Sequence, residues 1–167
     1  MATFGHLAAG LALSRAIPRR SGGRPPSWWD TGVVVVAAAV PDVDFVLPLP
    51  HRGMTHSAGF AGAMALGVAT AYLPSGARRA VAMGMLAALA TSSHAVLDVL
   101  TGESGAEAAW PMTDRPVALP SAPLPATPIG SELISRDGVF QAVGELAWSL
   151  PLALFGAWPW ARRALGR

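Results

Sequence analysis

Cysteine is absent from the 167 residues of this chain. Its absence excludes a disulfide framework, a thiolate metal site and a cysteine nucleophile. Charge is also scarce, because charged residues make up 13% of the chain, against about 25% in an ordinary soluble domain. Hydrophobic residues reach 52%. Together these values indicate a protein that lies in a lipid bilayer.

Lysine is absent too, so that all 12 basic residues are arginine. A nucleic-acid binder is one explanation of this basicity. However, most of the arginines sit in short clusters between apolar runs, which is typical of membrane topology. We therefore expect no nucleic-acid partner. The apolar stretch at 1–17 has no basic region before it, so we also expect no cleaved signal peptide.

Five apolar segments predict an all-α, membrane-embedded bundle of about five helices in a single domain, residues 1–167. The segments cover about 2–17, 28–49, 57–74, 80–100 and 138–160. Only the last two approach the roughly 20 residues that cross a bilayer as a straight helix. The first two are short for full spans, and Pro41 is expected to end or kink the second one.

Two polar stretches connect these segments. Residues 18–27 form a short basic linker, and residues 101–136 form a Pro-rich loop that we expect to be either disordered or a lid over a site. Small residues recur at every fourth position from Gly59 to Ala71 and from Ala80 to Ser92. These stripes predict close helix contacts in lipid, unless they are a by-product of the Ala- and Gly-rich composition.

The arginines also predict an orientation. If all five segments cross the membrane, nine arginines fall on one side and three on the other, which places the arginine-rich side in the cytoplasm. Four tryptophans flank the basic clusters as interfacial anchors: Trp28, Trp29, Trp158 and Trp160. We therefore expect a multi-pass protein of a bacterial-type inner (plasma) membrane.

Seven ionisable residues, including every histidine of the chain, fall at the arginine-poor, non-cytoplasmic end. They are His6, Asp42, Asp44, His51, His56, His94 and Asp98. Ionisable groups in or near a membrane are energetically costly and usually mark a functional site. The alternative is that they act structurally, as hydrogen-bonded core residues or helix caps.

The spacing of these residues favours metal ligation. His94 and Asp98 are four residues apart and share one face of a helix. Asp42 and Asp44 point the same way if their stretch is extended. Thr55 is expected to cap the third helix, which would place His56 in its first turn, next to the two aspartates.

Imidazole and carboxylate together suit Zn, Mn or Fe better than Ca or Mg. Seven candidates exceed the three protein ligands of a mononuclear catalytic zinc, so one or two ions are expected, with two favoured. We expect His6 and His51 to complete the ligand shell or move protons around five core ligands: Asp42, Asp44, His56, His94 and Asp98. Arg52 suits a phosphate or carboxylate oxygen of the substrate, with a local ion pair to Asp42 or Asp44 as its alternative role.

These motifs, taken in order, resemble the inner-membrane metal-dependent hydrolase family, also described as LexA-binding, inner-membrane-associated hydrolases. The matching motifs are Gly5-His6, Pro41-Asp42-Val43-Asp44, His51-Arg52-Gly53-Met54-Thr55-His56-Ser57, Ser93-His94, Leu97-Asp98 and Trp110-Pro111. The resemblance covers about residues 1–115 and implies a helical membrane hydrolase with a distant likeness to zinc-dependent phospholipases C. It carries the family's metal ligands onto the seven residues above. The C-terminal third matches poorly, so Glu132 and Glu145 are not expected in the site.

The sequence thus predicts a membrane-bound, metal-dependent hydrolase, with Arg52 and His51 as catalytic residues. Membrane lipid is its expected partner, and a lipid-linked phosphoester or another small molecule its expected substrate. A non-catalytic metal transporter or sensor with the same ligands is the main alternative, and a protein scaffold is a third. A serine esterase using Ser57 or Ser93 is less favoured, because neither serine has a nucleophile-elbow context.

Overall fold

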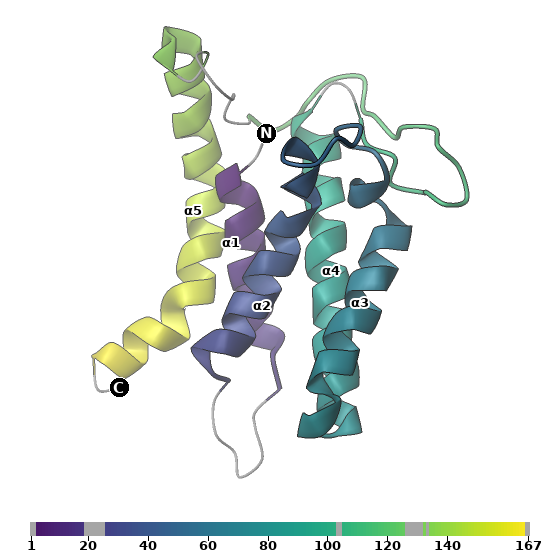
Figure 1. Ribbon diagram of the computed structural model, residues 1–167. Coiled ribbons are helices and arrows are strands. Elements are labelled where there is room, and N and C mark those ends of the chain that lie inside the picture. The colour runs from purple at the N-terminus through teal and green to yellow at the C-terminus, as the bar shows by residue number, and fades with distance from the viewer. Residues whose placement is uncertain (1–2, 19–25, 103–104, 126–131, 133, 166–167) are drawn as a thin grey trace.

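The structure is a computed structural model, and it describes all residues except 1–2, 19–25, 103–104, 126–131, 133 and 166–167. Within the described residues the chain forms five α-helices and no β-strand (Figure 1). The predicted all-α fold is therefore confirmed. Most of the basic linker at 18–27 lies outside the described residues, as do parts of the loop at 101–136.

The helices fall on the five predicted apolar segments. They are α1 (Thr3–Leu13), α2 (Trp28–Ala39), α3 (Ala58–Tyr72), α4 (Ala77–Thr101) and α5 (Arg136–Ala164). Short 3-10 helices join or extend them at Ser14–Ala16, Val40–Phe45, Met54–His56 and Leu73–Ser75. As Pro41 predicted, α2 ends at Ala39, and the chain tightens into a 3-10 helix.

The helices run up and down between two ends of the bundle (Figure 1). α1, α2 and α4 pack together in the middle, α3 packs on α4, and α5 packs on α1. The term 'ligand end' refers below to the end of the bundle at which α2 and α4 finish. We call the opposite end, where α3 finishes and α4 begins, the arginine end.

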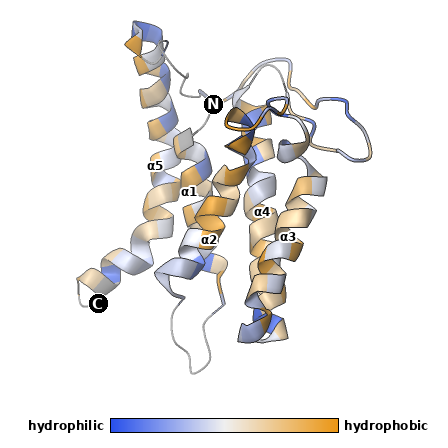
Figure 2. Cartoon of the chain, viewed as in Figure 1, coloured by the Kyte–Doolittle hydropathy of each residue, from blue (hydrophilic) through white to orange (hydrophobic). Residues whose placement is uncertain are grey.

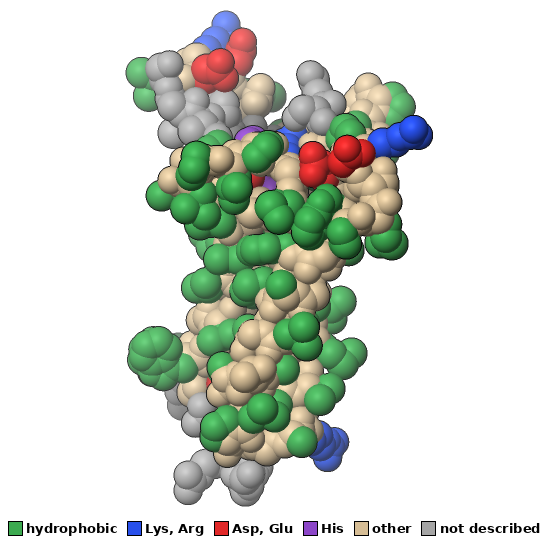
Figure 3. Space-filling model, turned by 45° about the vertical axis from the view of Figure 1, so that its right-hand side comes forward, with side chains coloured by type: hydrophobic (Ala, Val, Ile, Leu, Met, Phe, Trp, Pro, Cys, Tyr) green, Lys and Arg blue, Asp and Glu red, His purple; other side chains and the backbone are tan. Residues whose placement is uncertain are grey.

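Three helical stretches are long and apolar enough to cross a membrane: Ala58–Ser75, Ala77–Thr101 and Arg136–Arg162. The sequence predicted sufficient length for only the last two. The third stretch qualifies because the helix of α3 continues through the 3-10 turn at Leu73–Ser75. α1 and α2, with 11 and 12 residues, are only about 16–18 Å long at 1.5 Å per residue. Hydrophobic residues predominate in the middle of the helices (Figure 2), and apolar side chains cover the middle of the face shown in Figure 3.

Small and medium side chains form the core between the two ends. Val34 and Ala37 of α2 and Met83 and Ala87 of α4 are fully buried in it. Gly84 brings α4 against α3, since a Cβ at this position would lie 2.7 Å from the Ala65 carbonyl oxygen. The predicted stripe on α4 therefore packs at Ala80 and Gly84, but the stripe on α3 does not, because it is exposed from Ala63 to Ala71.

A buried ion pair ties the helices together at the arginine end. Asp30 caps the first turn of α2 with Ser27, and its carboxylate also lies 2.8 Å from Arg79 Nη2 and accepts a hydrogen bond from the Tyr72 hydroxyl. Arg79 in turn donates to the Pro18 carbonyl. The network links α2, α3 and α4, and it was not predicted from the sequence.

Candidate metal centre

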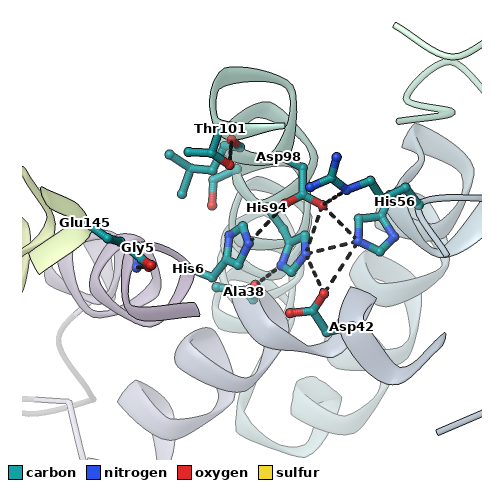
Figure 4. A network of polar contacts seen from close by, with 12 residues as sticks. Gly5, His6, Ala38, Asp42, His56, His94, Asp98, Thr101 and Glu145 are labelled. Atoms are coloured by element: carbon teal, nitrogen blue, oxygen red, sulfur yellow. Dashed lines mark hydrogen bonds and ion pairs between the residues drawn. The ribbon is translucent and has the colours of Figure 1, made fainter. Parts of the chain in front are cut away.

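Five of the seven candidate residues meet at the ligand end, from α1, the turn after α2, the turn before α3, and α4 (Figure 4). Asp98 lies at their centre, with Oδ1 3.4 Å from His6 Nε2 and Oδ2 3.1 Å from His56 Nε2. His94 Nε2 lies 3.3 Å from Asp42 Oδ1 and 3.7 Å from Asp98 Oδ2. The helical spacing of His94 and Asp98 therefore places both on one face, as predicted.

The orientation of His94 is set by the backbone of α2. Its Nδ1 lies 2.7 Å from the Ala38 carbonyl oxygen. Because a carbonyl can only accept, Nδ1 carries the hydrogen, and the neutral ring presents the lone pair of Nε2 to the centre. The His6 ring stacks on His94 with 3.5 Å between centroids, which holds His6 beside it.

His56 is oriented in the same way by a carboxylate. Its Nδ1 lies 3.4 Å from Asp44 Oδ2 and 3.0 Å from the Thr55 hydroxyl, which itself donates to Asp44. Nδ1 therefore carries a hydrogen, and Nε2, 3.1 Å from Asp98 Oδ2, either carries a second proton or presents a lone pair to a cation. The two Nε2 atoms of His56 and His94 face each other at 3.1 Å. Two lone pairs at this distance repel each other unless a proton or a metal cation lies between them.

Asp42 and Asp44 do not point the same way, so that part of the prediction is wrong. The stretch is a 3-10 helix rather than an extended strand. Asp42 reaches the Nε2 atoms of His56 and His94, whereas Asp44 binds the far side of His56, His51 Nδ1 at 3.2 Å and the Arg52 backbone N–H. Asp44 thus orients the ligands around it, as carboxylates behind metal-bound histidines commonly do.

Capping of α3 differs from the prediction as well. Ser57, not Thr55, is the N-cap and accepts from the Phe60 N–H. His56 consequently lies before α3, and Thr55 is available to bridge His56 and Asp44. The Ser57 and Ser93 hydroxyls donate to the backbone carbonyls of Met54 and Ala90, which does not support either serine as a nucleophile.

We expect Asp44→Asn to weaken zinc affinity by roughly 10- to 100-fold, because the amide cannot polarise His56 as a carboxylate does. Competition with a chromophoric chelator measures this affinity in the purified protein. Asp114→Asn, at an exposed position of the loop, is the matched control. Equal affinity in wild type and Asp44→Asn would show that Asp44 fixes only the turn.

Arg52 lies over the ligand end with its Nε 3.6 Å from Asp98 Oδ2. This acidic neighbour differs from Asp42 and Asp44, which the sequence analysis named as its ion-pair alternatives. The backbone of Arg52 adopts a φ of 62°, and its guanidinium packs against Gly102, where a Cβ would overlap it. Gly102 therefore leaves the space in which the guanidinium lies. His51 is more open, with its side chain 38% exposed.

The burial and charge of the cluster fit a divalent cation. His6, His56, His94 and Asp98 are at most 1% exposed. Asp42, Asp44, Asp98 and Arg52 sum to a charge of −2 when the histidines are neutral. Among the described residues, both ring nitrogens of His6, Asp42 Oδ1 and both Asp98 oxygens are buried without a hydrogen-bond partner. A cation would satisfy these atoms and offset the charge.

Without a cation, the cluster favours a proton on His56. Burial alone would lower the pKa of His56, but its contacts with Asp42 and Asp98 raise it to about 9. Burial likewise opposes ionisation of Asp42, yet its contacts with His56 and His94 hold the pKa of Asp42 below its usual range. A divalent cation would therefore displace a proton from this site.

Three overlapping groups place their ligand atoms within 4.8 Å of one another: His6, Asp42 and His94; Asp42, His51 and His56; and His56, His94 and Asp98. The shared members fit either one ion or two neighbouring ions. The predicted residues therefore converge, with Asp44 behind His56 rather than in any of these groups.

Glu145 was not expected near the site, yet α5 brings it next to α1. It is fully buried, and its Oε1 accepts from the Gly5 N–H at 2.9 Å, one residue before His6. The Trp148 ring also packs where a Gly5 Cβ would lie. The position of Glu145 inside an apolar segment could have indicated from the sequence that it is a functional or buried residue. Glu132 is exposed.

Comparison with known proteins places the chain in a family. No curated protein and no solved structure matches the chain. A family model described as YdjM inner membrane protein matches residues 1–164, which extends the resemblance beyond the first 115 residues. The chain therefore belongs to the YdjM inner membrane protein family and is a membrane protein.

Proposed function

We propose that the protein is a membrane-bound, metal-dependent hydrolase. The observation that carries this proposal is the pair of Nε2 atoms of His56 and His94, which lie 3.1 Å apart beside the buried carboxylate of Asp98. A cation held by imidazole and carboxylate fits this arrangement. Zn²⁺ is the preferred ion, Mn or Fe the alternatives, with one or two ions bound.

The residues divide the chemical work. Asp42, His56, His94 and Asp98 would hold the metal, and His6 would complete the shell. A divalent ion bound there supplies Lewis-acid activation of water and of the bond that is cleaved. His51 is half exposed and bonded to Asp44, so it is placed to move protons between solvent and the centre.

Arg52 would bind the substrate. Its guanidinium lies beside Asp98 over the ligand end, and a planar guanidinium suits two oxygens of a phosphoester. The centre also lies at one end of α4, a helix long enough to cross the membrane. A lipid or lipid-linked phosphoester, entering from the bilayer, is therefore the favoured substrate.

The distribution of polar groups favours a hydrolase over a transporter. A transporter needs polar groups through the depth of the membrane. Here the buried core of Val34, Ala37, Met83 and Ala87 lies between the ligand end and the buried Asp30–Arg79 pair of the arginine end. Among the described residues, the candidate ligands gather at one end only.

Activity of the purified protein in detergent tests the proposal. We expect hydrolysis of a soluble phosphodiester or of a phospholipid after zinc loading, and loss of this activity when a chelator removes the metal. Proteoliposomes loaded with a zinc-sensitive dye provide the second measurement. Zinc flux into the proteoliposomes without hydrolysis of either substrate would favour the transporter and contradict the hydrolase.

The orientation of the centre is a separate prediction. We expect the ligand end to face the non-cytoplasmic side, because nine arginines fall at the other end if all five segments cross. Ser121→Cys, in the loop after α4, should react with a membrane-impermeant thiol reagent in intact cells, whereas Ser75→Cys at the arginine end should not. The chain has no native cysteine to interfere. The reverse labelling pattern would place the centre in the cytoplasm.

A further inference from the structure

An apolar groove of about 370 Å³ lies beside the candidate metal centre. Its walls are the start of α3 and the second half of α4, and the loop after α4 contributes Ala108, Val117 and Leu119. The volume is within the range of small-molecule sites, about 300–1,000 Å³. Both wall helices are long and apolar enough to cross a membrane, and the groove lies between them at the ligand end.

The loop that closes the groove is held in place by backbone hydrogen bonds. The first N–H groups of α3, at Ala58 and Gly59, donate to the carbonyls of Ala108 and Trp110 at 2.9 and 3.0 Å. These N–H groups have no partner inside their own helix, so the loop completes their hydrogen bonding. An isolated β-bridge between Ala106 and Val117 folds the loop back on itself. The groove is therefore a built feature and not a gap under a loose segment.

Three residues that line the groove directly follow residues of the candidate metal cluster in the sequence. Ser57 follows His56, Ala95 follows His94, and Val99 follows Asp98. Each of these pairs places one side chain toward the cluster and the next toward the groove. The groove and the cluster are therefore built on the same stretches of backbone.

The lining decides the chemistry of the occupant. Small side chains at Ala58, Ser92 and Ala95 leave the space open, and the larger ones are aliphatic. Water is disfavoured there because a buried water needs two to four polar partners. For helices that cross a bilayer, the elongated apolar group at hand is a lipid hydrocarbon chain.

We propose that this groove binds one hydrocarbon chain of the lipid substrate and so presents its polar head group to the metal centre. The proposal rests on the proposed hydrolase function for the role of the head group. Binding of the chain itself is independent of hydrolysis. Selection for long-chain over short-chain substrates follows, because each buried methylene adds to binding.

Photolabelling tests the binding directly. The protein is placed in vesicles of phosphatidylethanolamine and phosphatidylglycerol that contain a phosphatidic acid with a diazirine in one acyl chain. In wild type we expect labelling of the α4 segment 92–100, and in Ala58→Leu about a tenfold decrease, the effect of losing burial of about two methylene groups. Ala71→Leu, an exposed position of α3 away from the groove, is the matched control.

A second variant and a kinetic comparison separate this proposal from the hydrolase function. Ser92→Leu fills the groove from α4 at an exposed position, so a folding defect of one variant leaves the other to decide. In both variants the ratio of kcat/KM for a long-chain to a short-chain phosphoester should fall about tenfold. Labelling that depends on the groove, without any hydrolysis, would contradict the proposed hydrolase function and support the proposal that the groove binds a hydrocarbon chain. Equal labelling and equal kcat/KM ratios in wild type and all variants would contradict hydrocarbon binding in the groove and would not affect the proposed hydrolase function.

Discussion

His94→Ala and Asp98→Ala are each expected to lower the bound metal from at least one ion per chain to a trace. Both side chains are fully buried, and each contributes an atom within 4 Å of the other and of His56. Removing one ligand from a three- or four-ligand site leaves too few donors for tight binding. Elemental analysis of the purified, detergent-solubilised protein measures the loss.

Control variants separate ligand loss from general damage to the fold. Asp114→Ala removes an exposed carboxylate of the loop and should leave metal content unchanged. Ser93→Ala changes the residue next to His94, whose hydroxyl donates only to the Ala90 carbonyl in the described contacts, and should also retain the metal. Full metal content in both His94→Ala and Asp98→Ala would contradict the assignment of the centre.

Arg52→Lys is expected to reduce turnover about 100-fold while metal content and thermal stability hold, because misplacing a substrate-binding group by about 1 Å can cost this much. Lysine keeps the positive charge beside Asp98 but loses the planar pair of donors. The kinetic constants for a soluble phosphodiester, measured together with metal content, report the effect.

A matched substitution and a neighbouring glycine sharpen this experiment. Arg115→Lys, exposed in the loop, should have no effect. Gly102→Ala should lower turnover as well, because the new Cβ takes the space of the Arg52 guanidinium without removing its charge. Lower stability with unchanged specific activity in Arg52→Lys would instead indicate that Arg52 serves only as the ion-pair partner of Asp98.

The helices were predictable because apolar runs between polar stretches leave few alternatives to buried or membrane-embedded helices. The predicted segment 57–74 matches the helical stretch Ala58–Ser75 within one residue, but it was judged too short to span the membrane, whereas the 3-10 turn at Leu73–Ser75 makes the stretch long enough. The stripe of small residues on α3 was misleading. Its packing face runs instead through Ala61 and Ala65, and only the backbone arrangement determines that choice.

For the site, the sequence predicted which residues meet but not how each one points. The candidate ligands lie at one end of the bundle because successive helices run in alternating directions. These directions can be predicted from the order of the apolar segments. The opposite directions of Asp42 and Asp44 depend on a 3-10 helix that two-residue spacing does not reveal. The contact of Glu145 with Gly5 depends on the packing of α5 against α1 across a sequence separation of 140 residues.

That contact also bears on the order in which the protein assembles. Turns of modest length connect the segments from α2 to α4, so Asp42, His56, His94 and Asp98 can come together soon after these segments are synthesised. His6 is made before all of them, yet the backbone beside it is held by Glu145 of α5. If the cluster binds metal as proposed, we therefore expect tight metal capture only after α5 has been synthesised and has packed on α1.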